Sequence, residues 1–428
     1  MSTDTRPFSR TVTARDVDSA YERIDPVVVR TPLQFSSRHA HRLDTEVWLK
    51  REDLQVVRSY KLRGAYNLLA RLSAADRERG VVCASAGNHA QGVAYACQQL
   101  RIQARIYVPG TTPRQKRNRI TALGGRHVEL LVVGDTYDAA SARAREDAAA
   151  SGAVLVPAFD APDVVAGQGT VAREIVEQLG GPPDVLVAPV GGGGLVAGCV
   201  TWLAEHHPSV RVVGVEPTGA ASMAAATAAG EPVTLDELDG FVDGAAVRRV
   251  GDVTASIVRE HAVDLVDVDP GVVCEEMLDM FQTDGIIAEP AGALASAAMR
   301  AWTGGAPVGS LEGKTVVSIV SGGNHDVSRY AEVIERALVS QGVKHYWLVD
   351  FPQEPGALRG FLDDVLGDDD DITLFEYVKR HNRETGPALV GIELGDPAEL
   401  PGLLKRLESS AVHAQKLSPD DPVFQYLL

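Results

Sequence analysis

The 428-residue chain has few aromatic residues, few cysteines and no long apolar run. Aromatic residues make up 5% of the chain, against 41 glycines, which favours an α/β protein with many tight strand-to-helix turns over an all-β protein. The four cysteines form no C-x-x-C pair, so neither a zinc site nor a disulfide framework is predicted. No stretch approaches the roughly 18 continuous apolar residues of a transmembrane helix, so no membrane span is predicted.

Basic residues are also scarce relative to acidic ones, and the net charge is -17. Because affinity for nucleic acids comes from Lys and Arg that neutralise phosphates, nucleic acids and anionic membrane surfaces are not expected partners. The first ten residues, MSTDTRPFSR, have no apolar core and do not resemble a signal peptide, so we expect a cytoplasmic protein. The acidic run at residues 368–371 is predicted to be a solvated loop, and no metal site is expected.

Three segments share one pattern: a short apolar strand, a loop of small residues and an apolar helix. The strands are residues 80–84, 184–190 and 315–320. Near-continuous apolar strands that alternate with helices predict a parallel sheet covered on both faces. Ligands of open α/β sheets bind at the carboxyl ends of the strands, so we expect the three loops to converge on one site. Further strands of this type are predicted at residues 105–108, 127–133 and 210–215.

The pattern changes near Gln341. Beyond it, the order strand, helix, strand, strand, helix in about 80 residues predicts a small ferredoxin-like module. At roughly 150 residues per domain, the chain length allows two or three domains. The predicted elements of the module are a strand at 345–351, a helix at 356–366, strands at 372–378 and 388–394, and a helix at 400–407.

Residues 191–194 are four consecutive glycines that follow the second strand. Backbone N–H groups without neighbouring Cβ atoms can approach an anion closely, and the following helix adds its positive end, so the loop is a candidate phosphate cradle. Residues 192–197 also match GxGxxA, the dinucleotide fingerprint, and Glu216 follows where a ribose-binding acid is expected. Alone, the loop leaves open a dinucleotide, another phosphate-bearing cofactor and a plain tight turn.

The surroundings of Lys61 decide between these interpretations. The segment S-Y-K-L-R-G-A at residues 59–65 resembles the cofactor-lysine segment of fold-type II pyridoxal-phosphate enzymes. The three small-residue loops match that family's other motifs in the same order. S-A-G-N-H-A-Q-G from Ser85 resembles its substrate-carboxylate loop, the glycine run its phosphate loop, and S-G-G-N from Ser321 its pyridine-nitrogen loop.

Within this family the chain is most similar to the biosynthetic threonine dehydratases, over nearly all residues after about Arg15. K-R-E-D-L-Q at residues 50–55 and D-G-A-A-V at residues 243–247 support this similarity. The implied fold is α/β: a fold-type II catalytic region of two parallel-sheet subdomains, then one α+β ferredoxin-like, ACT-like regulatory domain. The expected boundaries are 1–340 for the catalytic region, with a small subdomain inserted at about 60–155, and 341–428 for the regulatory domain.

The resemblance implies a site in which Lys61 forms a Schiff base with pyridoxal phosphate and then acts as the base at the substrate α-carbon. It implies that Asn88 bonds the phenolic oxygen of the cofactor and that Ser321 faces the pyridine nitrogen. A simpler interpretation of Ser85 and Asn88 is that they cap the following helix. The other implied residues are Gly191, Gly192, Gly193, Gly194 and Leu195 for the phosphate, Ser85, Ala86, Gly87, Asn88 and His89 for the substrate carboxylate, and Tyr60, Gly244 and Glu289 as further contacts.

The implied activity is β-elimination of water from L-threonine, after which the released enamine tautomerises and loses ammonia by hydrolysis to give 2-oxobutanoate for isoleucine biosynthesis; L-serine would give pyruvate. The alternatives are a serine dehydratase or serine racemase of the same fold, an NAD-dependent oxidoreductase, and an inert amino-acid sensor. Related racemases carry a Ser at the position of Ala86, which cannot move a proton, so racemisation is not expected. By the same resemblance, we expect inhibition by isoleucine, opposition by valine, and a homotetramer.

Overall fold

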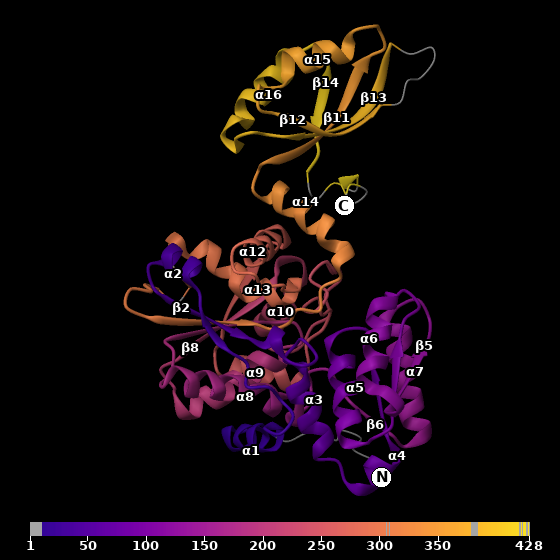
Figure 1. Ribbon diagram of the computed structural model, residues 1–428, viewed down its shortest axis with the longest axis vertical. Coiled ribbons are helices and arrows are strands. Elements are labelled where there is room, and N and C mark those ends of the chain that lie inside the picture. The colour runs from indigo at the N-terminus through magenta and orange to yellow at the C-terminus, as the bar shows by residue number, and fades with distance from the viewer. Residues whose placement is uncertain are drawn as a thin grey trace. The chain divides into compact units, whose positions relative to one another are not determined.

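The computed structural model describes residues 11–304, 306–307, 309–377, 384–418, 421, 423–424 and 427. The chain divides into two compact units, one ending at Asp326 and the other beginning at Val327 (Figure 1). Among the described residues, no helix is both long enough and apolar enough to cross a lipid bilayer.

The first unit contains a six-stranded sheet in which every neighbouring pair is parallel except β1 and β2. In Figure 1, α12 and α13 lie on one side of this sheet and α8 and α9 on the other, and its central strands are buried. The predicted parallel sheet covered on both faces is confirmed. The order is β1 (Leu33–Phe35), β2 (Glu46–Arg51), β10 (Thr315–Val320), β7 (Val185–Pro189), β8 (Arg211–Pro217), β9 (Asp264–Val268), and the helices are α8 (Pro162–Leu179), α9 (Gly194–His206), α12 (Pro270–Gln282) and α13 (Pro290–Ala298).

A second sheet has four parallel strands, and the part of the chain that forms it lies between β2 and β7 of the large sheet. Alternate residues of its central strand β3 face opposite sides. Val81 and Cys83 pack with residues of α3 and α5, whereas Val82 packs with residues of α7. The order is β5 (Val128–Val132), β4 (Ala104–Val108), β3 (Val81–Ala84), β6 (Val154–Leu155), and the helices are α3 (Lys61–Ala70), α4 (Ala74–Arg79), α5 (Asn88–Leu100), α6 (Arg114–Gly124) and α7 (Tyr137–Ser151).

Helix α8 packs against both α3 and α9, and it approaches each of them at a pair of glycines. A Cβ on Gly167 would lie 2.6 Å from the Cα of Gly64 in α3. A Cβ on Gly198 in α9 would lie 2.5 Å from the backbone nitrogen of Gly169. Side chains at these crossings would push the helices apart, because interiors are already close-packed. The contacts of α8 therefore set the separation between α3, which begins at the candidate lysine, and α9, which begins in the glycine loop.

The first α-helix of the second unit is α14 (Tyr330–Ser340), and the unit continues in the order β-α-β-β-α-β. Its four-stranded antiparallel sheet, in the order β12-β13-β11-β14, packs α15 and α16 around Trp347, Phe361 and Leu403. The predicted ferredoxin-like order is confirmed, and residue 378 of one predicted strand lies outside the described residues. The elements are β11 (Lys344–Pro352), α15 (Ala357–Val365), β12 (Asp371–Tyr377), β13 (Thr385–Glu393), α16 (Leu400–Ser409) and β14 (His413–Lys416).

Strand β14 is the element of this unit that the sequence did not predict. It lies at the sheet edge with mostly exposed side chains, so it lacks the apolar alternation by which a strand is recognised. In the acidic run, Asp370 accepts a hydrogen bond of 2.7 Å from the Gly367 N–H and forms the turn before β12.

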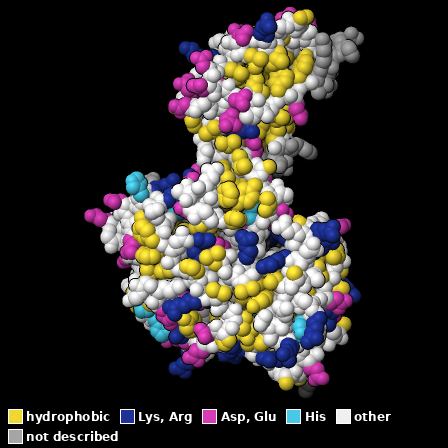
Figure 2. Space-filling view, in the orientation of Figure 1, with side chains coloured by type: hydrophobic (Ala, Val, Ile, Leu, Met, Phe, Trp, Pro, Cys, Tyr) yellow, Lys and Arg dark blue, Asp and Glu magenta, His cyan; other side chains and the backbone are white. Residues whose placement is uncertain are grey.

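On the face shown in Figure 2, basic and acidic side chains are interspersed over the first unit. The helices not yet given are α1 (Ala14–Ile24), α2 (Ser37–Leu43), α10 (Ser222–Ala229) and α11 (Asp252–Glu260).

Candidate active site

Lys61 is the first residue of α3, and the residues before it are bonded to the loop that contains Ser321. The Tyr60 N–H donates to the Ser321 carbonyl at 3.1 Å. Ser59 and Gly322 form an isolated antiparallel bridge. Two predicted motifs that are far apart in the sequence are therefore joined by main-chain pairing, which places Ser321 beside the start of α3.

The Lys61 side chain is directed to the segment between β6 and α8. Its Nζ donates to the Ala158 carbonyl at 3.0 Å. The next residue, Phe159, lies against the glycine loop. A Cβ on Gly192 would lie 2.2 Å from the Phe159 ring, and one on Gly194 would lie 3.2 Å from the Phe159 Cβ. Ala158 and Phe159, which the sequence did not single out, thus connect the lysine amine to the glycine loop.

The glycine loop connects the end of β7 to the start of α9. Gly193 has φ +84°, a left-handed conformation that favours glycine, and a Cβ there would lie 2.3 Å from Cε of Met223. The first N–H groups of α9, which begins at Gly194, have no partner inside the helix and carry the positive end of its dipole. Such a loop is suited to an anion, so the residues present fit the phosphate group of pyridoxal phosphate.

Glu216, the acid of the dinucleotide interpretation, has a different role in the structure. Its two carboxylate oxygens accept hydrogen bonds from the backbone N–H groups of Met223 at 2.7 Å and Ala224 at 2.8 Å. Burial raises the pKa of this carboxyl to about 7. Because both oxygens are used near the start of α10, Glu216 is committed to the protein's own backbone rather than to a ribose.

The loop after β3 leads into α5, whose N-cap is Gly87, and neither Ser85 nor Asn88 caps this helix. Instead, the Ser85 hydroxyl accepts the Gly87 N–H at 3.2 Å. A Cβ on Gly87 would meet nothing within 4 Å, so open space lies beside this residue. The His89 Nε2 donates to the Val156 carbonyl at 3.0 Å. Burial, with the charge of Lys61, lowers the pKa of His89 to about 4, so its ring is neutral at pH 7.

Asn88 and Glu289 form the junction between three loops. The Asn88 side-chain amide donates to the Glu289 carboxylate, and its oxygen accepts from Asn324 at 2.7 Å. The Glu289 N–H donates to the Gly322 carbonyl at 3.1 Å, beside Ser321. Glu289 is buried, and burial followed by the charge of Asp243 raises its pKa to about 7.

The loop at residues 243–247 also reaches this junction. A Cβ on Gly244 would lie 3.8 Å from the Glu289 carboxylate, and one on Gly191 would lie 2.9 Å from the Cα of Ala245. The structure therefore brings together Lys61, the glycine loop, Asn88 and Ser321, as predicted. It also places Glu289 and Gly244 among them.

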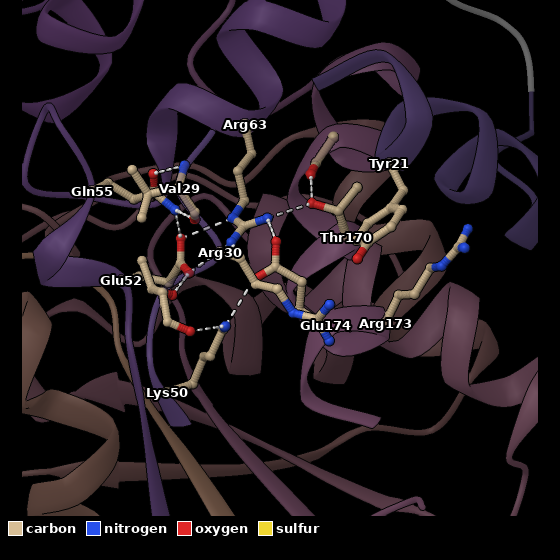
Figure 3. Close-up of polar contacts among 12 residues, drawn as sticks. Tyr21, Val29, Arg30, Lys50, Glu52, Gln55, Arg63, Thr170, Arg173 and Glu174 are labelled. Carbon is tan, nitrogen blue, oxygen red and sulfur yellow. Dashed lines mark hydrogen bonds and ion pairs between the residues drawn. The ribbon is translucent and has the colours of Figure 1, made fainter. Parts of the chain in front are cut away.

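A buried ionic network lies two residues beyond Lys61 (Figure 3). The Arg63 guanidinium makes two bonds of 2.8 Å to Glu52, bonds of 2.7 and 2.9 Å to Glu174, and one of 3.1 Å to the Thr170 hydroxyl. Lys50 Nζ donates to Glu174 at 2.8 Å. Burial lowers the pKa of Arg63, but the charges of Glu52 and Glu174 more than offset this and raise it overall.

The sequence analysis did not predict this network, although Lys50, Glu52 and Arg63 belong to the quoted motifs. Its bonds join α3 to the end of β2 and to α8. Because a guanidinium bonded to two carboxylates has a fixed orientation, the network holds the first turn of α3, where Lys61 stands.

A lysine at a helix start, a glycine cradle beside it, one parallel sheet and one that is parallel except for its edge strand β1 define the class of fold-type II pyridoxal-phosphate enzymes. Residues 24–322 match the family described as "Pyridoxal-phosphate dependent enzyme". Residues 335–427 match the "C-terminal regulatory domain of Threonine dehydratase".

Comparison with curated relatives identifies the family within this class of enzymes. The chain is 59% identical over 416 residues to a biosynthetic L-threonine dehydratase of Mycobacterium bovis, covering 96% of this chain and 95% of that one. It is 54% identical over 421 residues to that of Corynebacterium glutamicum, covering 97% and 95%. The chain therefore belongs to the biosynthetic L-threonine dehydratase family.

Solved structures agree with this assignment. The processed threonine deaminase isoform 2 of Solanum lycopersicum superposes with a TM-score of 0.70 at 36% identity, over 77% of this chain and 96% of that one. Maize serine racemase superposes with a TM-score of 0.71 at 28% identity, over 77% and 99%. The same fold is thus used for deamination and for racemisation, and the choice between them depends on individual residues.

Proposed function

We propose that this chain is an L-threonine ammonia-lyase that uses pyridoxal phosphate, held by Lys61, to form 2-oxobutanoate and ammonia as the first step of isoleucine biosynthesis. The observation that carries the proposal is the position of the Lys61 amine. It lies 3.0 Å from the Ala158 carbonyl, next to the residue that packs on the glycine loop. The 59% identity to a threonine dehydratase supports threonine as the substrate.

Pyridoxal phosphate, when bound, supplies an electron sink for the negative charge that develops at the substrate α-carbon. Lys61 Nζ would hold the cofactor, and the free amine of Lys61 would be the base that accepts the α-proton of the substrate. Leu195 and the glycine loop would bind the phosphate through backbone N–H groups. The members of this loop are Gly191, Gly192, Gly193 and Gly194.

Ser321 and Asn88 orient the cofactor ring in this proposal. The Ser321 hydroxyl donates to the Ala291 carbonyl at 3.1 Å, and it can rotate to meet a ring nitrogen. As a neutral group, it does not enforce a positive charge on that nitrogen, which favours elimination over transamination. The Asn88 amide donates one hydrogen to Glu289 and has a second one for the phenolic oxygen. Tyr60, Gly244 and Glu289 surround these groups.

The start of α5 is the proposed site of the substrate carboxylate. The open space beside Gly87 and the free N–H groups of a helix start suit an anion. His89 contributes its backbone, because its ring is bonded to Val156. The proposed residues are Ser85, Ala86, Gly87, Asn88 and His89.

We propose that the second unit gives isoleucine inhibition and that valine opposes it, in a cytoplasmic homotetramer. The family match of residues 335–427 to a regulatory domain supports this role. We propose that residues 1–340, with a small subdomain at about 60–155, form the catalytic region and that residues 341–428 form the regulatory domain. The two compact units of the structure divide earlier, after Asp326. Isoleucine that leaves the activity of the full chain unchanged would refute this regulation.

The proposed reaction is tested with the purified full chain and pyridoxal phosphate. We expect a visible absorption band and release of 2-oxobutanoate from L-threonine. A colourless protein that still deaminates threonine would refute the cofactor assignment. A coloured protein that deaminates L-serine and leaves L-threonine unchanged would refute the assignment of threonine as the substrate.

Serine racemase is the second candidate, because maize serine racemase shares the fold. Racemisation needs a second proton donor on the other side of the cofactor, and Ala86 has no group that can supply it. We expect L-serine to give pyruvate without D-serine, measured by chiral chromatography. Substantial D-serine from the unmodified chain would overturn this conclusion.

A further inference from the structure

Thr254 lies in the first turn of α11 and packs against the glycine loop. Its side chain is fully buried. Its hydroxyl donates to the Gly192 carbonyl at 2.7 Å and lies 3.3 Å from the Gly251 carbonyl. A hydroxyl has one hydrogen to donate, and the shorter distance identifies Gly192 as its main acceptor. The buried hydroxyl is therefore committed to the glycine loop.

This bond determines the orientation of one peptide group. Because a trans peptide is planar, the Gly192 carbonyl and the Gly193 N–H point in opposite directions. When the carbonyl is held by Thr254, the N–H of Gly193 is turned away from Thr254. A Cβ on Gly193 would lie 3.1 Å from the Thr254 Cβ, so the loop rests directly on this side chain. The peptide cannot rotate without breaking the bond.

Helix α11 is itself held by the segment that contacts Lys61 and the glycine loop. The Asp160 carboxylate accepts the backbone N–H groups of Asp252 at 3.1 Å, Val253 at 2.9 Å and Thr254 at 3.2 Å. Asp160 directly follows Phe159, which packs on the loop, and Ala158, which binds the Lys61 amine. Three consecutive residues thus hold the lysine, the loop and the helix that carries Thr254.

We propose that Thr254 is a positioning residue for the phosphate of the cofactor. Its hydroxyl holds the Gly192 peptide so that the N–H of Gly193 faces the phosphate, and Asp160 holds Thr254 in turn. The inference rests on the proposed function, since it assumes that the glycine loop binds the phosphate of pyridoxal phosphate. Thr254 itself touches neither cofactor nor substrate in this proposal.

The test compares cofactor-free full-length wild type, Thr254→Val and Thr254→Ser. Valine has the shape of threonine without the hydroxyl, and serine keeps the hydroxyl. Each protein is titrated by absorbance with pyridoxal phosphate and with pyridoxal, which has the aldehyde but no phosphate. We expect Thr254→Val to bind pyridoxal phosphate about tenfold more weakly, equivalent to about 1.4 kcal/mol. We expect Thr254→Ser to bind like the wild type, and pyridoxal to bind all three proteins equally.

Unchanged affinity of Thr254→Val for pyridoxal phosphate would overturn the proposal. Equal weakening for both compounds would also overturn it, because the effect would then not concern the phosphate. If Thr254→Val does not fold by circular dichroism, Thr254→Cys, with a weaker donor, is judged by the same criterion. Failure of the wild type to bind pyridoxal phosphate would instead refute the proposed function, so the two failures are distinguishable.

Discussion

The side-chain amine of Lys61 donates a hydrogen bond of 3.0 Å to the main-chain carbonyl oxygen of Ala158. A carbonyl holds the amine in place without an ion pair that would have to be broken before the amine reacts. The position of the amine therefore depends on a backbone segment rather than on another side chain. That segment also packs on the glycine loop through Phe159.

Replacement of Lys61 by alanine removes one hydrogen bond at a partly buried position. We expect a melting temperature within a few degrees of the wild type, because one hydrogen bond contributes about 1 kcal/mol. Deamination of threonine should fall by at least about 10³-fold, since a positioned base alone contributes roughly 10²–10⁴-fold. Added methylamine should restore part of the rate. A Lys61→Ala protein that keeps its visible band and its activity would contradict the assignment.

Replacement of Gly87 by alanine should affect substrate binding without affecting the fold. The added Cβ meets nothing within 4 Å, so the melting temperature should not change. The methyl group would occupy the space proposed for the substrate carboxylate, so KM for threonine should rise about tenfold, equivalent to about 1.4 kcal/mol. Gly181→Ala is the matched control, because a Cβ there also meets nothing within 4 Å. Gly181 is far in sequence from the proposed carboxylate loop at residues 85–89. Equal KM values for the two variants would contradict the proposed carboxylate site.

Replacement of Arg63 by methionine leaves two buried carboxylates, Glu52 and Glu174, with Lys50 as their remaining cation in the network. An uncompensated buried charge costs about 3–5 kcal/mol, so the urea midpoint of the first unit should fall strongly. Arg143→Met is the control, because its pair with Glu146 is exposed and surface pairs contribute about 0–1 kcal/mol. Similar midpoints for the two variants would show that the network does not hold α3.

The stability of the cofactor-free protein should depend on pH through Glu289. Burial and Asp243 raise its pKa to about 7 in the folded state, against 4.5 as the ordinary value. A raised carboxyl pKa contributes stability that is present below about pH 4.5 and is lost as the pH rises through about 7. At about 1.4 kcal/mol per pKa unit, the loss is on the order of 3 kcal/mol.

This dependence is measured from urea unfolding between pH 4.5 and 8, with Glu289→Gln as the comparison. Glutamine can still accept the hydrogen bond from Asn88, but it does not titrate. The free energy of unfolding of the wild type should therefore fall relative to that of Glu289→Gln as the pH rises. Parallel curves would mean that Glu289 does not titrate in this window.

The sequence by itself determined the local structure and the chemistry of the main loops. Apolar strands at 184–190 and 315–320, with a small-residue loop and a helix after each, predicted the parallel sheet that is observed. The segment around Lys61 and the order of the four motifs predicted the family that the relatives show. Strands, helices and turns can be predicted in this way because they depend on periodicity and on neighbouring residues.

Strand β2 shows where this reasoning stops. Three of its six residues, Glu46, Lys50 and Arg51, are charged, so its apolar run is only the three residues 47–49. It nevertheless lies inside the large sheet, because tertiary packing supplies partners for its charges. Lys50 is fully buried, and its amine is paired with Glu174, 124 residues later, and bonded to the Thr31 carbonyl and the Gln178 side chain.

The tertiary structure alone decided which residues surround the motifs. The contact of Lys61 with Ala158, the packing of Phe159 on Gly192, and the bond from Thr254 to Gly192 join residues that are distant in the chain. Ala158, Phe159 and Thr254 carry no local signal, because a carbonyl, a ring or a hydroxyl acquires a role only from the group packed against it. The sequence thus determined which residues have reactive groups, and the packing of α3, α8, α9 and α11 decided how those groups are held.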